Sequence, residues 1–394
     1  MMVENINYPV FQTVALSFLL LFFLSISLRQ KKHTEIFPAS VTTELKGVAI
    51  LMVLFAHIGY FLFWDHRFMF PLSVFGGIGV DLFLILSGYG LAVSASRKNL
   101  GVWQFYKRRL SKILMPFWLT LIVILLADKF VLGHSQSIVQ IAQNFFGFFP
   151  SADIYNDPDS PLWFITIIIF YYLIFPWLFF KKWPTLSAIM IFVVSWGVLQ
   201  LSLPIKEDVL MTYNLHAVAF PLGVLFFALV NKINWLSACS KNIYKKIAEI
   251  LLPIMKKIPQ RIILSCQKYF SELNQTWYGT IIVGLLAFII YFAIYSGVGK
   301  GIFLGESLSL LVAVPVIILF LIKRNEFGFL TLLGSYAFEI YLIHWPIMYY
   351  YDVFYKWLPA SVATIAYIFL FLILSKLLKF VSDTLGKLIF GKTS

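Results

Sequence analysis

The stretch TTELKGVAILMVLFAHIGYFLFW, residues 42–64, places a lysine at one end of an apolar run and a histidine eleven residues further, near its middle. On an α-helix, Lys46 and His57 differ by about 20° around the axis and by about 16 Å along it, so they share one face. A titratable side chain inside a membrane segment is costly and indicates a functional site. His57 is therefore a candidate functional residue near mid-membrane, with Lys46 at the cytoplasmic interface. The alternative is a structural histidine hydrogen-bonded to a neighbouring helix.

Two neighbouring segments carry further candidates. FGGIGVDLFLILSGYGLAVSASRK places Asp81 in the outer half of a membrane segment, with Ser87 and Gly88 deeper. Its five glycines favour close helix approach, which is their simplest explanation. In FYKRRLSKILMPFW, Arg109 and Lys112 are one helical turn apart, so both side chains can bind one anionic group just above the cytoplasmic surface. The alternative is that this pair only sets membrane orientation.

A late run, GSYAFEIYLIHWPI, holds Glu339, Tyr341 and His344. Glu339 and His344 differ by about 140° around a helix, so we do not expect them to face one partner. A carboxylate within an apolar run is expected to face a polar cavity or a basic partner such as Lys46 or Arg109.

Composition identifies the surroundings of these residues. Hydrophobic residues make up 60% of the 394-residue chain and charged residues only 12%, far from the composition of a soluble domain. Apolar runs of membrane-spanning length recur throughout and lack the alternation of outer-membrane strands. We predict an all-α, polytopic transmembrane helical bundle of about eleven helices, at about 9–28, 46–64, 72–93, 113–132, 162–180, 185–203, 211–230, 278–296, 306–322, 334–351 and 359–379.

The net charge of +13 reflects orientation. If the first helix enters from outside, 26 of the 31 Lys and Arg residues fall in cytoplasmic loops or helix ends. This asymmetry follows the positive-inside rule, so we predict an external N-terminus and a cytoplasmic C-terminus, and no nucleic-acid partner. The two cysteines, Cys239 and Cys266, lie far apart in one loop, so neither a disulfide nor a metal site is expected.

Five motifs in order carry a resemblance: LKGVAILMVLFAH, GVDLFLILSGY, RRLSKILMP, SPLWFITIIIFYY and GSYAFEIYLIHWPI. Over roughly residues 40–380 the chain resembles the membrane acyltransferase 3 family, whose members move acyl groups, often acetyl, onto carbohydrates. Lys46 and Lys112 stand where the family usually has arginine. The family core has ten membrane helices. The resemblance thus divides the chain into 1–35, an additional N-terminal transmembrane helix with a basic cytoplasmic turn, and 36–394, a membrane acyltransferase domain with a basic cytoplasmic loop at 231–276.

The resemblance also implies roles. His57 corresponds to the family's proposed catalytic histidine, and a neutral imidazole suits a base that removes the proton of an acceptor hydroxyl. Lys46, Arg109 and Lys112 would meet the phosphates of coenzyme A, from which the pantetheine arm reaches His57. Trp163 matches a family tryptophan; its alternative is an interfacial belt residue. Asp81 would either orient His57 or receive the acceptor hydroxyl. Ser87, Gly88, Glu339, Tyr341 and His344 are further candidates for substrate binding.

We expect an acyl-CoA-dependent O-acyltransferase of the cell membrane, without a permanently bound cofactor or metal. The donor would be acetyl-CoA, with succinyl as an alternative acyl group, and the acceptor a cell-surface or lipid-linked carbohydrate. Membrane lipid is the expected surrounding partner, and homo-oligomerisation stays open. The alternative is a polysaccharide exporter or proton-coupled transporter that uses His57, Asp81 and Glu339.

Overall fold

The computed structural model describes residues 6–30, 37–63, 65–98, 101–133, 136–152, 162–233, 260–295, 302–351 and 353–390. Its elements are α1 (Pro9–Ile26), β1 (Leu28–Gln30), α2 (Ala39–Ala56), α3 (Gly76–Arg97), α4 (Val102–Ala127), α5 (Ile138–Phe145), α6 (Trp163–Leu178), α7 (Pro184–Leu199), α8 (Glu207–Leu215), α10 (Gln260–Tyr295), α11 (Ile302–Ile322), β2 (Asn325–Phe327), α12 (Gly328–Ser335), α13 (Ala337–Tyr350) and α14 (Ala360–Phe390). A further helix covers 219–233. Two π-helical segments, His57–Leu62 and Asp128–Leu132, extend α2 and α4, and a 3-10 segment, Leu72–Phe75, precedes α3.

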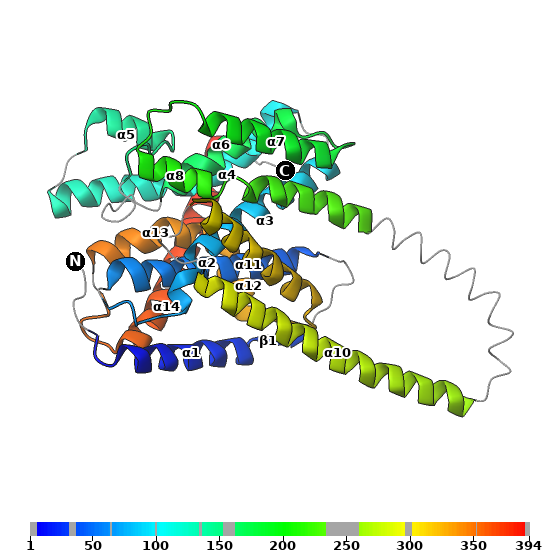
Figure 1. Cartoon of the computed structure of the whole chain (residues 1–394). Helices are drawn as coiled ribbons and strands as arrows, with labels where there is room; N and C mark the ends of the chain where they lie inside the picture. The colour runs from blue at the N-terminus through cyan, green and yellow to red at the C-terminus, as the bar shows by residue number, and fades with distance from the viewer. Residues whose placement is uncertain are drawn as a thin grey trace.

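The chain is an all-α, multi-pass membrane protein. In its described part, seven helices are long and apolar enough to cross a membrane, and three shorter apolar helices accompany them. Nine of the eleven expected runs each overlap one helix, whereas 211–230 and 334–351 are each divided between two; the number of spans and their orientation stay predictions. Cys239 and residues 234–259 of the expected basic loop lie outside the described residues. Residues 260–276 of that loop form the first part of α10, which extends beyond the rest of the bundle (Figure 1).

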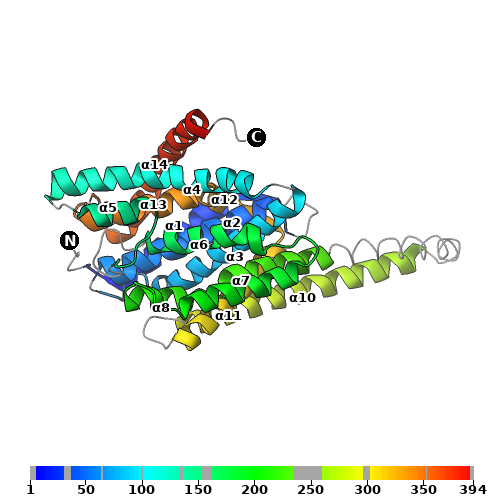
Figure 2. The same cartoon turned by 90° about the horizontal axis from the view of Figure 1, so that it is seen from above.

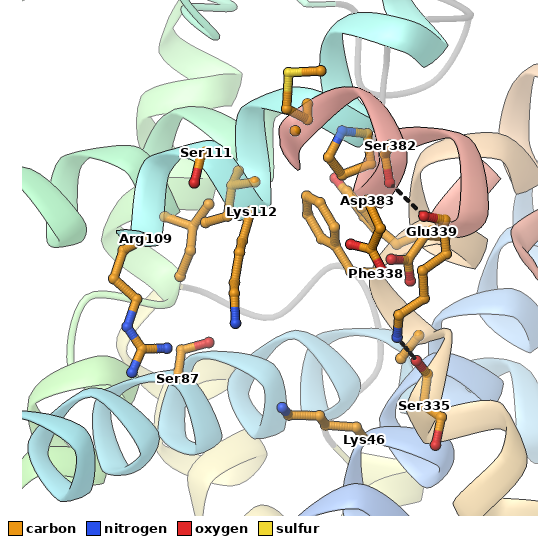
Figure 3. A pocket seen from close by; sticks show the side chains of 18 of the residues that line it. Lys46, Ser87, Arg109, Ser111, Lys112, Ser335, Phe338, Glu339, Ser382 and Asp383 are labelled. Carbon is orange, nitrogen blue, oxygen red and sulfur yellow. Dashed lines mark hydrogen bonds between the residues drawn. The ribbon is translucent and has the colours of Figure 1, made fainter. Parts of the chain in front are cut away.

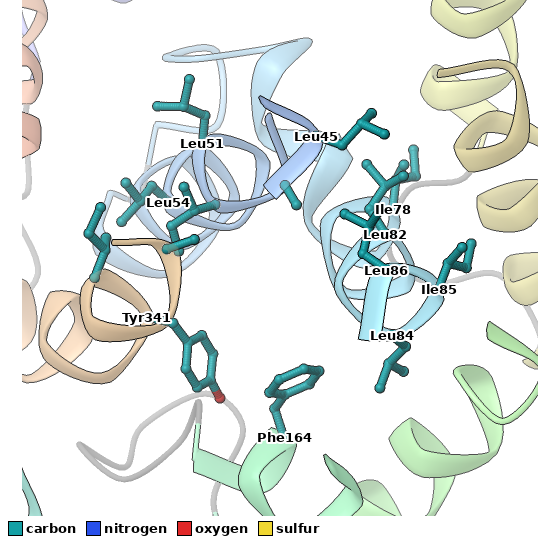
Figure 4. Close-up of a cluster of buried hydrophobic side chains, with 14 of the residues drawn as sticks. Leu45, Leu51, Leu54, Ile78, Leu82, Leu84, Ile85, Leu86, Phe164 and Tyr341 are labelled. Carbon is teal, nitrogen blue, oxygen red and sulfur yellow. The ribbon is translucent and has the colours of Figure 1, made fainter. Parts of the chain in front are cut away.

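Helix α2 lies at the centre of the bundle, and small residues bring its neighbours close. A Cβ atom at Gly47 would meet the Leu330 carbonyl oxygen on α12, and one at Gly334 would meet the Thr43 carbonyl oxygen. On its other side, a Cβ at Gly79 of α3 would lie 2.7 Å from the Ala49 carbonyl oxygen. Backbones can approach this closely only where glycine supplies no side chain. The leucine and isoleucine side chains of α2 and α3 form the core around these contacts (Figure 4).

A two-stranded ribbon ties the end of α1 to the start of α12. β1 and β2 pair antiparallel, with Leu28 opposite Phe327. Beside them, the fully buried Glu44 of α2 accepts hydrogen bonds from Lys323 Nζ and the Phe327 backbone N–H, both at 2.5 Å. The three-residue strands are too short for the sequence pattern to reveal.

The bounds of α2 place its two functional candidates differently along the helix from the expected run 46–64. The helix starts at Ala39, seven residues before Lys46, and its π-helical extension ends at Leu62, five residues after His57. Lys46 therefore lies about 10 Å inside the helix and not at its end, while His57 lies nearer the opposite end than the middle. The predicted segment started at residue 46, after the true start of the helix, because Glu44 and Lys46 interrupt its apolar pattern.

Candidate active site

A cavity of about 580 Å³ opens between α2, α3, α4, α6, α12, α13 and α14. Its lining contains six of the predicted residues from four separate segments of the chain: Lys46, Ser87, Arg109, Lys112, Glu339 and Tyr341. In the close-up, Lys46 and Lys112 extend toward one another, with Arg109 and Ser87 beside them (Figure 3). The structure thus brings together the cations that the sequence motifs singled out.

These three cations lack a matching set of carboxylates. Within the described ranges, none of Lys46, Arg109 and Lys112 makes an ion pair shorter than 4.0 Å with an acidic side chain. Lys46 lies within electrostatic reach of Arg109 as well as of Lys379. The buried Nε of Arg109 has no hydrogen-bond partner among the described residues. Because buried donors and gathered like charges are costly without a partner, the arrangement suits an anion with several oxygen atoms.

Helix α14 adds charged residues that the sequence pattern indicated only as orientation signals. Lys379, Asp383 and Lys387 line the same cavity, because α14 continues to Phe390, about three turns beyond the expected apolar run. Lys379 Nζ donates a 2.7 Å hydrogen bond to the Ser335 carbonyl oxygen (Figure 3). Five cations thus line the cavity with two carboxylates, Asp383 and Glu339. From the sequence alone, a basic residue near a helix end that lines a cavity cannot be distinguished from one that only sets the membrane orientation of the helix.

Glu339 lies where its chemistry predicted. It is 8% exposed and lines the cavity, and its basic electrostatic neighbours are Lys379 and Lys46. Lys46 was one of the two expected partners, and Arg109 is not among the neighbours. His344, on the same helix, faces elsewhere, as the angular separation predicted. Glu339 therefore offsets part of the cavity's positive charge at the base of α13.

His57 is held by the backbone of its own helix. Its Nδ1 lies 2.8 Å from the Val53 carbonyl oxygen, and its ring lies 5.2 Å from that of Trp345. A carbonyl oxygen only accepts, so Nδ1 must carry the proton, and in the neutral ring Nε2 keeps the lone pair. His57 also begins the π-helical segment His57–Leu62, a distortion that often marks functional sites. The geometry leaves His57 able to accept a proton at Nε2.

A second histidine adjoins His57. His344 Nε2 lies 3.4 Å from His57 Nδ1, and the ring centroids are 4.9 Å apart. The fully buried His344 donates through Nδ1 to the carbonyl oxygens of Tyr341 at 2.7 Å and Ile340 at 3.2 Å, so its Nε2 presents a lone pair to His57. His344, expected among the substrate-binding residues, instead lies behind the candidate base. The two histidines come from separate motifs and lie 287 residues apart in the sequence.

Tyr341 connects the cationic cavity to the histidine pair. It lines the cavity, and its ring centroid lies 5.9 Å from that of His344 and 5.3 Å from that of Phe164. Phe164 also lines the cavity, and the two rings lie edge to face beside the core of α2 and α3 (Figure 4). The end of the cavity formed by these rings therefore lies one side chain away from His344 and two from His57.

Asp81 belongs to a different cluster, which corrects the expectation that it orients His57. One carboxylate oxygen accepts from His216 Nδ1 at 2.7 Å and the other from the Ser309 hydroxyl. All three residues are at most 5% exposed. Orientation of His57 comes instead from Val53. His216 was not among the predicted site residues. Its position as a titratable residue in an apolar run was the feature of the sequence that could have indicated this cluster.

Trp163 and Gly88 lie outside the cavity lining. Trp163 stacks on His216, with ring centroids 5.8 Å apart and planes 12° apart, so its indole packs against the Asp81 cluster. Gly88 packs against the backbone of Phe220, where a Cβ would meet the carbonyl oxygen. Gly88 therefore serves helix packing, which was the alternative given for it. The positions of Trp163 and Gly88 do not support the substrate-binding roles expected of them.

The fold and the cavity define a class of protein: a multi-pass helical membrane protein in which a cation-lined cavity adjoins a buried histidine pair. A family model described as an acyltransferase domain matches residues 45–380, which cover most of the chain. The chain therefore belongs to the membrane acyltransferase 3 family and is an acyltransferase. No curated protein and no solved structure gives a significant match.

Proposed function

We propose that this acyltransferase transfers an acyl group, acetyl by preference, from acyl-CoA to a hydroxyl of a carbohydrate acceptor. The observation that supports the donor is the convergence of Lys46, Arg109 and Lys112 on one cavity whose end adjoins the histidine pair. Phosphate oxygens are suited to such cations, and Arg109 presents a planar donor fork. The carbohydrate acceptor and the cell membrane as location rest on the family resemblance.

In the proposed reaction the acceptor hydroxyl gives its proton to His57 Nε2 as its oxygen attacks the thioester carbonyl carbon. The carbon–sulfur bond then breaks, the new ester leaves, and the coenzyme A thiolate takes the proton from the imidazolium. His344 Nε2 accepts from the Nδ1–H of His57 during this step and favours its charged form. The rise of α2 separates Lys46 from His57 by about 16 Å, a distance that an extended pantetheine arm can cover.

The transporter alternative has less support. A proton relay through His57, Asp81 and Glu339 would need these groups to communicate. Their contacts place them in three surroundings instead: His57 beside His344, Asp81 between His216 and Ser309, and Glu339 in the cavity. Membership of an acyltransferase family favours the enzyme further.

Donor binding tests the proposal. Arg109→Ala and Lys112→Ala should each weaken binding of acetyl-CoA about 10- to 100-fold, because each removes a charge-assisted hydrogen bond to phosphate. Binding of a truncated acetyl-pantetheine thioester should change little. Calorimetry on the purified protein measures both, and Lys107→Ala is the matched control because Lys107 is an exposed cation on the same helix. Equal loss for both donors would place phosphate recognition elsewhere.

A further inference from the structure

A second cavity, of about 320 Å³, lies between α6, α7, α8 and the segment after α5. Most of its lining is aliphatic or aromatic. Its mouth includes the exposed side chains of Phe146 and Leu173, whereas Tyr171, Ser195 and Tyr213 at its floor are at most 4% exposed. The cavity is thus an apolar pocket with an open rim and a buried inner end. Its volume falls at the lower end of the range for small-molecule sites.

The outer surface of this part of the bundle is the kind that faces hydrocarbon. On α7, Ile189, Val193 and Trp196 are each more than half exposed, and Leu173 at the mouth is 44% exposed. In a membrane protein such apolar side chains contact lipid tails. Helices α6, α7 and α8 also lie together at one edge of the bundle (Figures 1 and 2). A ligand would therefore enter this cavity from the lipid, which selects molecules with a hydrocarbon chain.

The inner end of the cavity leads toward the reaction site. The Tyr213 ring lies 6.0 Å from Trp163, whose neighbour Phe164 lies 5.3 Å from Tyr341 of the cationic cavity. The buried Tyr213 hydroxyl makes no hydrogen bond of good geometry among the described residues, and its polar neighbour is the Thr166 hydroxyl. Thr166 beside it already donates to the Gly147 carbonyl oxygen and accepts from the Phe149 N–H. A buried hydroxyl in this state is an available contact for a polar head group.

We propose that this cavity holds the hydrocarbon chain of a lipid-linked acceptor, with the polar head beyond Tyr213 and directed toward Tyr341. The proposal rests on the proposed acyl transfer and narrows its acceptor to carbohydrate carried on a lipid. Donor and acceptor then approach the histidine pair through two cavities, which the rings of Trp163, Phe164 and Tyr341 separate.

Binding is tested without catalysis by photolabelling. The purified full-length protein is irradiated with a long-chain alkyl glucoside that carries a diazirine in its chain, and adducts are mapped by mass spectrometry. Adducts at residues 166–173 and 195–205 should be lost in Ser195→Phe, which fills the cavity, and in Leu199→Trp. They should persist in Val193→Phe, which adds the same side chain to the exposed face of α7. Equal labelling in all variants would mean non-specific labelling of an apolar surface and would overturn the proposal.

Turnover tests the same idea with two acceptors that share one sugar, with and without the alkyl chain. The chain should raise kcat/KM by about tenfold or more in the unmodified protein and in Val193→Phe, because it is bound in an apolar pocket. Ser195→Phe should lose this gain. Detergent micelles take up the chain equally for every variant, so the comparison isolates the cavity. A gain that survives in Ser195→Phe overturns the lipid-linked acceptor, whereas failure to acylate either acceptor contradicts the proposed function and leaves the labelling result standing.

Discussion

At the scale of single residues, the proposed chemistry depends on which nitrogen of His57 carries the proton. The Val53 carbonyl oxygen, 2.8 Å from Nδ1, fixes the proton there and leaves Nε2 as the base. His344 adds an acceptor on the same side as Val53, held by two carbonyl oxygens of its own helix. In the proposed reaction His57 is therefore the group that moves the proton, and His344 is a positioning residue that acts through it.

Substitution of the two histidines should separate these roles. His57→Ala should lower kcat about 100- to 10,000-fold, the usual contribution of a general base, with donor affinity unchanged. His344→Phe should lower kcat about 10- to 100-fold through loss of one acceptor to a charged ring, and His344→Gln should recover part of it because its amide oxygen accepts. Steady-state kinetics and acetyl-CoA binding on the purified variants measure both effects. Full turnover in His57→Ala would remove the base assignment.

Residue spacing predicts contacts within one helix better than contacts between helices. The one-turn spacing of Arg109 and Lys112 agrees with their position in the lining of one cavity, which Lys46 also lines. For Asp81, the alternative in which it orients His57 was wrong, because no spacing shows that His216 and Ser309, 135 and 228 residues away, contact its carboxylate. The proximity of His344 to His57 was missed for the same reason.

At the scale of elements, the cavity depends on how closely α12 approaches α2. Gly47 and Gly334 place backbone against backbone, and each lies next to a cavity residue, Lys46 and Ser335. The sequence predicted that the glycines of α3 pack helices. This is confirmed for Gly79 and Gly88 but not for Gly90, where an added methyl group would have no neighbouring atom within 4 Å. Helix boundaries were less predictable, because charged residues at Lys46 and along α14 end the apolar pattern before the helix ends.

Adding one methyl group at Gly334 should test the close packing of α12 against α2. Gly334→Ala should destabilise the protein by about 1–3 kcal/mol, because the new Cβ would overlap the Thr43 carbonyl oxygen and α12 would have to shift. The same shift should weaken acetyl-CoA binding at the cavity. Gly90→Ala is the control: its site is open, so alanine should leave stability equal or slightly higher. Thermal midpoints in detergent compare the two, and an unchanged midpoint for Gly334→Ala would contradict the close approach.

At the scale of the whole molecule, the cationic cavity and His57 lie toward opposite ends of α2. Lys46 is seven residues from one end and His57 five residues from the other. The distribution of basic residues predicts that the Lys46 end faces the cytoplasm, where coenzyme A thioesters are available. We therefore predict that only the acyl group changes sides, while coenzyme A stays with the basic face and the acceptor with the other.

Sealed proteoliposomes of uniform orientation measure this directly. Radiolabelled acetyl-CoA is supplied only at the basic face and the carbohydrate acceptor only at the opposite face. We predict free coenzyme A on the donor side and labelled acceptor on the other, with both products absent in vesicles that contain His57→Ala. Labelled acceptor that forms only when both substrates share one face would contradict transfer across the membrane through His57.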